Sequence, residues 1–422
     1  MLKSLFLSTS RELTLFSKIS REVFLFGAMV VFITLPWAKS LSSFGIGIAI
    51  GMGFVYAMVN LKELTKEDKR YIFLFFMMYG LGVMSYFYSE NIDEAMAKLF
   101  LKLPLLLLPF SLPLVRKLGD KRRLFLLMTF LLVVFGNALV STIHYFLNFE
   151  ELNAMVLHAK PIPILGKIYH IQFSVFNALS IFVGIYLLDK LKKNKWKYLF
   201  AFLAGANFIM IHILAARTGI FSFYLTAGVL LLFYTIKNKS IKGFIALGIM
   251  VLSLVAAYFF STSFRNRVYD TEKDLRTYME GTYPNHYSNT QRIMAFKTAL
   301  KVLEKNPFKG VGIGDVKDEM LVQYELDKSP LLIETRKKPH NQFLEIGLQS
   351  GIVSLVVLLL VFLFPFIKSR HILTTAFLML FFISMQFESL LERQASLYVF
   401  SLFYVILMPL GKRETEGAST IS

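Results

Sequence analysis

A polar segment meets a long apolar run at residues 339–354, which read PHNQFLEIGLQSGIVS. The apolar character continues to about residue 367, far enough for a transmembrane helix of roughly 20 residues. The run starts at His340 and Asn341 and carries Gly-x-x-Ser at 351–354. Histidine exchanges protons readily near neutral pH. We therefore expect His340 at a membrane surface, where the head group of a lipid-linked substrate would lie.

Comparable apolar runs recur along the whole chain. Of its 422 residues 55% are hydrophobic, and the mean hydropathy is +0.57. About twelve runs are long enough to be read as membrane spans. They lie near 22–38, 41–60, 71–88, 100–115, 124–147, 170–188, 198–216, 219–235, 243–260, 342–367, 371–386 and 396–410. We predict an all-α integral membrane protein with about 12 transmembrane helices.

The formal charge of +18 has a pattern that indicates membrane topology. The N-terminal segment, alternate connections and the C-terminal tail carry 25 of the 46 Lys and Arg residues, and the short connections and span ends on the other side carry only seven. Those seven are Lys39, Lys98, Lys102, Lys160, Lys167, Arg217 and Arg393. Because basic short loops stay in the cytoplasm, we predict that both termini are cytoplasmic. Topology accounts for the basicity, so no nucleic-acid partner is expected.

The spans divide nine plus three around one long polar segment. We predict a membrane region over 1–260, an outer loop over 261–339, and three spans with a cytoplasmic tail over 340–422. The loop carries 14 Lys and Arg against 11 Asp and Glu. Apolar residues at helical spacing predict an amphipathic helix near 290–305. It could lie along the outer leaflet or pack on the rest of the loop.

Several classes of site are disfavoured. The chain has no cysteine and therefore no disulfide or thiolate chemistry. It contains neither His-Glu-x-x-His nor Asp-x-Asp, so no metal site and no cofactor are expected. The glycines at 310–314 have no strand before them, and we interpret them as a tight turn rather than a nucleotide loop.

Arginines on the predicted outer side are the main candidates for anion binding. Arg217 lies between two apolar runs, where an arginine usually has a functional or paired role, although a snorkelling anchor is the alternative. Arg292 opens the predicted loop helix, and Arg336 and Lys338 precede His340. These last two are secondary candidates, since a solvated charge run also explains them.

Together these residues suggest a reaction at the outer face. His340 would take a proton from a hydroxyl group. Arg217 and Arg292 would hold a departing pyrophosphate and neutralise its charge. The outer face has no nucleotide sugars, so the natural donor is a glycan on a polyprenyl pyrophosphate.

At this point the chain resembles the O-antigen ligase and polymerase superfamily of bacterial envelope glycosyltransferases. His340-Asn341, nine spacer residues and Gly351 resemble the signature that ends the large loop of that family. Arg217 in Arg-Thr-Gly resembles its first essential arginine. Arg292, followed by Asn-Pro-Phe-Lys-Gly-Val-Gly at 306–312, resembles its loop arginine. The family usually has tryptophan where this chain has Phe296, and glycine is common where it has Ser354.

The resemblance implies twelve spans with a periplasmic loop between spans nine and ten of a bacterial inner membrane protein. It implies an inverting, metal-independent transfer of a glycan from undecaprenyl pyrophosphate to an acceptor hydroxyl. For a ligase the acceptor is lipid A–core. His340 would be the base, Arg217 and Arg292 would bind pyrophosphate, and His170 and Asn341 are secondary candidates. Glu388 and Arg393 rank lower.

Two alternatives stay open at this stage. A repeat-unit polymerase would use the same chemistry with a second lipid-linked glycan as acceptor. A twelve-span transporter or flippase belongs to another class, but the nine-plus-three division and the large loop do not resemble the related halves of many transporters.

Overall fold

The computed structural model describes residues 2–191, 195–282, 288–369 and 371–409, and within these ranges every regular element is helical. The α-helices are α1 (Leu2–Thr34), α2 (Lys39–Val59), α3 (Lys66–Tyr86), α4 (Ile92–Leu107), α5 (Leu112–Arg116), α6 (Gly119–Leu147), α7 (Phe149–Leu157), α8 (His170–Lys190), α9 (Lys197–Leu214), α10 (Arg217–Asn238), α11 (Ile241–Phe260), α12 (Thr262–Met279), α13 (Ser288–Lys305), α14 (Val316–Leu326), α15 (Gln342–Lys368), α16 (Ile372–Ser384) and α17 (Gln394–Leu407). Short 3-10 helices are η1 (Leu61–Glu63), η2 (Leu108–Ser111), η3 (Ile333–Thr335) and η4 (Leu390–Glu392).

The all-α membrane architecture is confirmed, but the count of twelve spans is not. Eight helical segments in the described ranges are long and apolar enough to cross a bilayer: α2, α4 with α5, α6, α8, α9, α10, α11 and α15. The apolar helices α16 and α17 have only 13 and 14 residues. In α3 the first five residues are all charged, and in α1 charged residues continue as far as Glu22. Both helices therefore have apolar stretches shorter than a standard span.

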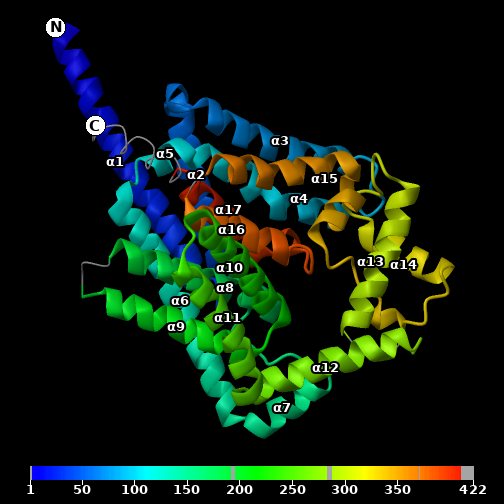
Figure 1. The fold of residues 1–422 in the computed structure, drawn as a ribbon. Coiled ribbons are helices and arrows are strands. Elements are labelled where there is room, and N and C mark those ends of the chain that lie inside the picture. The colour runs from blue at the N-terminus through cyan, green and yellow to red at the C-terminus, as the bar shows by residue number, and fades with distance from the viewer. Residues whose placement is uncertain (1, 192–194, 283–287, 370, 410–422) are drawn as a thin grey trace.

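The helices have two chemically different ends. At one end, here called the basic end, Arg116 pairs with Asp68, Lys117 with Glu63 and Arg122 with Glu22. At the other, the loop end, α12, α13 and α14 gather outside the bundle, away from the start of α1 (Figure 1). Three segments that are far apart in sequence, around residues 22, 63–68 and 116–122, thus meet at the basic end.

The core of the bundle is built around α8. Almost every residue from Ile171 to Leu187 is buried, and α8 contacts α6, α9, α10 and α16. By contrast, α11 has one buried residue, Gly243, and most of its large apolar side chains are exposed on the side away from α10 and α12. So much exposed apolar surface is typical of a helix that contacts lipid.

The helix α13 packs on the rest of the loop region. Ala295, Ala299 and Val302 form a small core with side chains of α14 and of the first turns of α15. Phe296, which sequence periodicity assigns to the apolar face, is 41% exposed. The buried stripe consists of small residues, which the hydrophobic pattern alone does not mark.

A kink at Ser350 and Gly351 divides α15 into two helical pieces. Gly351 has φ +82, and a Cβ on it would lie 1.8 Å from the Phe308 carbonyl oxygen. The backbone N–H of Ile352 donates to the Pro307 carbonyl at 2.8 Å. Only glycine permits this approach. The last position of the His-Asn-x9-Gly signature therefore lets the turn after α13 dock into α15.

Candidate functional site

His340 lies at the loop end, just before α15, in a strained backbone conformation. Its φ is +49, a left-handed value that is uncommon for residues other than glycine. Its ring Nδ1 lies 3.0 Å from Glu388 Oε2, and the side chain is partly buried. Such strain persists only where surrounding contacts hold it, and it is concentrated at functional sites.

Asn341 holds this conformation in place. Its Oδ1 accepts the backbone N–H groups of Phe343 and Leu344 at 2.9 and 3.0 Å, which caps α15. Its Nδ2 donates to the Gln386 carbonyl at 3.2 Å. Asn341 therefore joins the start of α15 to the α16–α17 connection, which carries Glu388. Its role in the structure is to position His340.

Glu388 is the centre of what we call the Glu388 cluster, which also contains His340, Arg292 and Arg393. Both arginines lie 3.9 Å from its carboxylate, and the Glu388 side chain is only 3% exposed. Burial by itself raises the pKa of Glu388. The hydrogen bond with His340 and the nearby cationic groups outweigh it and lower that pKa below its ordinary value. Glu388 is therefore an ionised carboxylate at neutral pH.

Arg217 belongs to a second group, the Arg217 cluster, with Arg267 and Asp270 of α12. A left-handed Ala215, with φ +48, ends α9 and reverses the chain so that Arg217 is the first residue of α10. Its guanidinium lies 3.3 Å from Asp270 and donates to Thr271 Oγ1 at 3.0 Å. The same oxygen of Asp270 lies 3.5 Å from Arg267.

The two clusters have more positive than negative charge. Four guanidinium groups share two carboxylates, Asp270 and Glu388, and one oxygen of Asp270 is buried without a hydrogen-bond partner. Arg217, Arg267 and Arg292 are near enough to interact electrostatically, and His170 interacts with all three and with Glu388. The nearby carboxylate of Asp274 accepts the backbone N–H groups of Asn289 and Thr290 at the start of α13.

Of the sequence candidates, the structure thus brings together His340, Asn341, Arg217, Arg292 and His170. Tyr169, which precedes His170, lies under Arg393, whose guanidinium is 4.7 Å from the ring centroid. Burial first, and then the charge of Glu388, raises the pKa of the Tyr169 hydroxyl, which stays protonated. These side chains come from the starts of α8, α10, α13 and α15 and from the α16–α17 connection.

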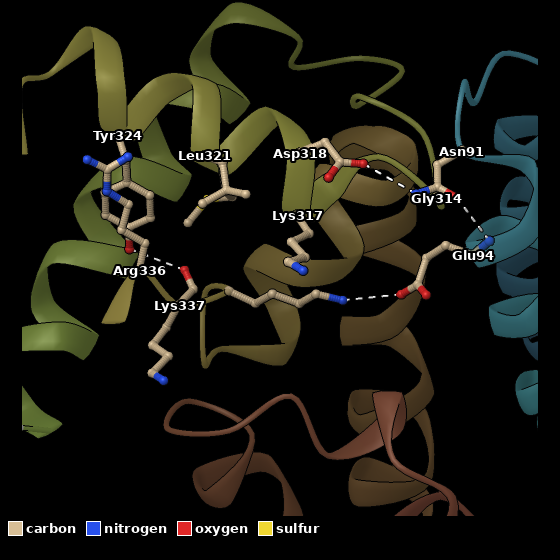
Figure 2. A pocket seen from close by; sticks show the side chains of 11 residues that line it. Asn91, Glu94, Gly314, Lys317, Asp318, Leu321, Tyr324, Arg336 and Lys337 are labelled. Carbon is tan, nitrogen blue, oxygen red and sulfur yellow. Dashed lines mark hydrogen bonds and ion pairs between the residues drawn. The ribbon is translucent and has the colours of Figure 1, made fainter. Parts of the chain in front are cut away.

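Arg336 and Lys338 face a different part of the loop end. Both line a cavity of about 490 Å³ between α14 and the start of α4 (Figure 2). The Arg336 guanidinium lies over the Tyr324 ring, 5.9 Å from its centroid, and Lys338 lies 3.3 Å from Glu94. Both cations thus have partners of their own, and no contact with Glu388 or Asp270 is observed for either.

Sequence reasoning missed Arg267 and Asp270 and undervalued Glu388. No local pattern marks them, because Glu388 lies 48 residues from His340 and Asp270 lies 53 residues from Arg217. The one available signal was an isolated acidic residue, Glu388, at the end of an otherwise apolar stretch.

A buried set of ion pairs along α4 was also missed. Glu94, Lys98 and Lys102 are spaced four residues apart and share one face of the helix. Lys98 pairs with Glu345 of α15 at 3.3 Å, and Lys102 pairs with Glu392 of η4 at 2.7 Å. We call these two buried pairs the α4 ion pairs; Glu94 itself forms an exposed pair with Lys338. Sequence reasoning read both lysines as ordinary span ends.

Carboxylates and imidazoles are spread out rather than grouped. Within the described ranges no three His, Asp or Glu side chains are placed to hold one metal ion. At the site, the imidazole–carboxylate pair of His340 and Glu388 lies beside several guanidinium groups.

Part of the chain is similar to a known protein family. Residues 200–359 match the model of a family described as O-antigen ligase. An uncharacterized protein of Haemophilus influenzae (strain ATCC 51907 / DSM 11121 / KW20 / Rd) is 27% identical over 340 residues, which cover 76% of this chain and 79% of that protein.

The matched segment contains Arg217, Arg267, Arg292, His340 and Asn341. It also contains Gly351, at which α15 kinks. The resemblance read from the loop signature and the two arginines is thereby confirmed, and a multi-pass membrane enzyme of the glycosyltransferase type is what the family implies. Residues 200–359 are thus similar to the O-antigen ligase family, and this match supports the superfamily that the loop signature indicates.

Proposed function

We propose that this protein is an O-antigen ligase-like glycosyltransferase. It transfers a glycan from undecaprenyl pyrophosphate to an acceptor hydroxyl, which for a ligase belongs to lipid A–core. The observation that carries the proposal is the surplus of guanidinium groups next to an imidazole–carboxylate pair at the loop end. The family assignment favours a transferase over a transporter.

His340 acts as the base in this proposal. With Nδ1–H donating to Glu388, the free Nε2 accepts the proton of the acceptor hydroxyl. The ionised Glu388 fixes the tautomer and stabilises the imidazolium that forms, as a buried carboxylate does for a catalytic histidine elsewhere. The acceptor oxygen bonds to the anomeric carbon as the bond to pyrophosphate breaks, with inversion.

The arginines bind the leaving group. Arg217 is 24% and Arg292 23% exposed, so both remain accessible to a ligand. A guanidinium presents two parallel N–H groups to phosphate oxygens, and fixed cations stabilise the charge that develops on the departing pyrophosphate. Arg267 lies deeper and supports Arg217 through the shared Asp270. These side chains do the work that a divalent cation does in other glycosyltransferases, so no metal is required.

We also propose how the protein is oriented in the membrane and how the chain divides into membrane and loop regions. The loop end faces the periplasm, and the basic end faces the cytoplasm of an inner-membrane protein with both termini inside. Residues 1–260 and 340–422 form the membrane region, and 261–339 form the periplasmic loop. An outward-facing site would receive lipid-linked glycans after they have crossed the membrane.

A conservative substitution at Arg217 tests the anion-binding role. Arg217→Lys keeps one positive charge but loses the planar fork, so we expect transfer to fall about 10- to 100-fold, and Arg217→Ala to lower it at least about 100-fold. Transfer is measured with purified protein, lipid-linked donor and acceptor. Normal transfer by a correctly inserted Arg217→Ala protein would remove Arg217 from the site.

The glycan profile of a deletion strain separates the ligase from the polymerase. Loss of every glycan-bearing lipid A–core band indicates a ligase, whereas retention of a single-repeat band indicates a polymerase. Accumulation of lipid-linked glycan on the cytoplasmic face would instead support a transporter and contradict the proposal.

A further inference from the structure

Seven basic residues lie in the short connections and span ends on the loop side of the molecule. Three of them line one pocket. The pocket measures about 240 Å³ and lies at the loop end between the starts of α2, α8 and α17. Its cations are Lys39, Lys167 and Arg393. Since lysine and arginine are scarce in the short connections of this side, topology does not account for three of them in one place. We call it the Lys39 pocket.

Specific contacts between distant segments build the Lys39 pocket. The backbone N–H of Lys167 donates to the Pro36 carbonyl at 2.7 Å. Gly166 has φ +114, and a Cβ there would lie 2.4 Å from the same oxygen, so glycine is needed for this approach. Gln394 Nε2 donates to the Lys39 carbonyl at 2.9 Å and to Ser43 Oγ at 2.8 Å. The two lysines are therefore carried by backbone that is held in place.

The cations of the pocket are not neutralised by the protein. In the described part of the chain no ion pair involves Lys39 or Lys167, and both side chains are exposed. Arg393 is 47% exposed and shares Glu388 with Arg292 and with the imidazole of His340. The one carboxylate in the lining, Glu392, is paired with Lys102 at 2.7 Å.

Helix polarity adds to this positive potential. Residues from the first turns of α2, α8 and α17 line the pocket, and none of these helices has a side-chain hydrogen bond capping its start. The N-terminal end of a helix favours anions. Hydroxyl and amide groups of Ser42, Gln172 and Tyr398 complete a polar lining suited to an oxygen-rich ligand.

We propose that the Lys39 pocket binds a phosphate group carried by the acceptor glycolipid. This inference rests on the proposed function. The volume corresponds to about eight water molecules of about 30 Å³ each, enough for a phosphate with part of its sugar. Arg393 lines the pocket and also lies 3.9 Å from Glu388, so an anchored acceptor would reach the His340–Glu388 pair. The donor pyrophosphate has separate ligands on α10, α12 and α13.

The test measures acceptor preference with the full-length protein in phosphatidylcholine proteoliposomes. The acceptor glycolipid is supplied with its phosphate groups or after phosphatase treatment, and the Michaelis constant is determined for each. We expect the wild type to favour the phosphorylated acceptor by about fivefold to thirtyfold, because two or three partly exposed charge contacts are involved. The preference should fall with rising salt.

Two matched variants identify the residues responsible. Lys39→Gln with Lys167→Gln should lose most of the preference. Lys317→Gln with Lys328→Gln removes the same charge from exposed lysines outside the pocket, and should keep it. Lys317 lines the cavity of Figure 2, so this control also tests whether that cavity takes the phosphate.

Direct binding of both glycolipids, measured without donor, separates this inference from the proposed function. The wild type could show no transfer and still bind the phosphorylated glycolipid through Lys39 and Lys167. That result would contradict the transfer reaction and support phosphate binding in the Lys39 pocket. Equal preference in the wild type and the Lys39→Gln, Lys167→Gln protein overturns the pocket. A second result would also overturn the pocket: binding by the wild type that does not depend on acceptor phosphate but does depend on added phosphatidylglycerol. The ligand of the pocket would then be the headgroups of the bulk lipid.

Discussion

The Glu388 cluster and the α4 ion pairs use charged residues in opposite ways. Along α4, Lys98 and Lys102 are nearly inaccessible, and each has a carboxylate of its own. Around Glu388 one carboxylate serves His340, Arg292 and Arg393, and the cations stay partly exposed. Buried charges need partners, because taking an unpaired ion out of water costs several kcal/mol.

We propose that this difference distinguishes charges that stabilise the fold from charges that bind a ligand. The α4 ion pairs join α4 to α15 and η4. Gln349 extends the set, donating to Glu345 at 3.0 Å and accepting from Lys102. The Glu388 and Arg217 clusters retain surplus positive charge that an anionic substrate would neutralise. Substitutions in the two regions should therefore affect different measured quantities.

The largest effect is expected at His340. General-base catalysis contributes about 10²–10⁴-fold, so His340→Ala should lower transfer by that factor while the protein still inserts. His340→Gln keeps hydrogen bonding without basicity and should be nearly as inactive. Initial rates of transfer, normalised to the amount of folded protein in the membrane, measure both.

Two outcomes at His340 would change the assignment. If Gln restores most of the activity, His340 positions the substrate and is not the base. If His170→Ala is more damaging than His340→Ala, the base is His170, which interacts electrostatically with the same arginines and with Glu388.

A loss of stability is expected at Lys102. Lys102→Met leaves Glu392 mostly buried without its cation, and breaking such a pair costs about 3–5 kcal/mol. Removing both charges with Lys102→Met and Glu392→Gln should recover most of that loss. The midpoint of thermal unfolding, measured on the purified protein in detergent, gives the difference in stability between the variants. Equal midpoints for the single and double variants would show that the pair is not what stabilises this region.

Sequence analysis identified the residues of the candidate site that stand in a short motif or are unusual among their neighbours. His340 and Gly351 stand in one short signature, and Arg217 is conspicuous between two apolar runs. The α4 ion pairs could not be found this way, since Lys98 and Glu345 are 247 residues apart. Glu345 even lies among the signature's nine spacers, where residue type alone gives it no role.

The fold shows the same division. Each span predicted from hydropathy contains a helix in the structure, because a run of apolar residues can be recognised from neighbouring residues alone. Hydropathy could not separate full spans from short ones such as α16, in which eight of the 13 residues are buried inside the bundle. The burial of such a helix depends on which neighbours surround it, and the neighbours are set by tertiary packing.

The smallest effect is expected at Lys338, and it tests where the site ends. The Lys338–Glu94 pair joins side chains that are 38% and 42% exposed, and exposed pairs contribute about 0.2–1 kcal/mol. Lys338→Gln should therefore change transfer less than about fivefold, in contrast to Arg217→Lys. Initial rates at saturating donor and acceptor measure it. A loss of tenfold or more would extend the anion-binding site to the segment before His340, as sequence position alone suggests. It would also mean that exposure and pairing do not separate structural charges from ligand-binding charges at this end of the molecule.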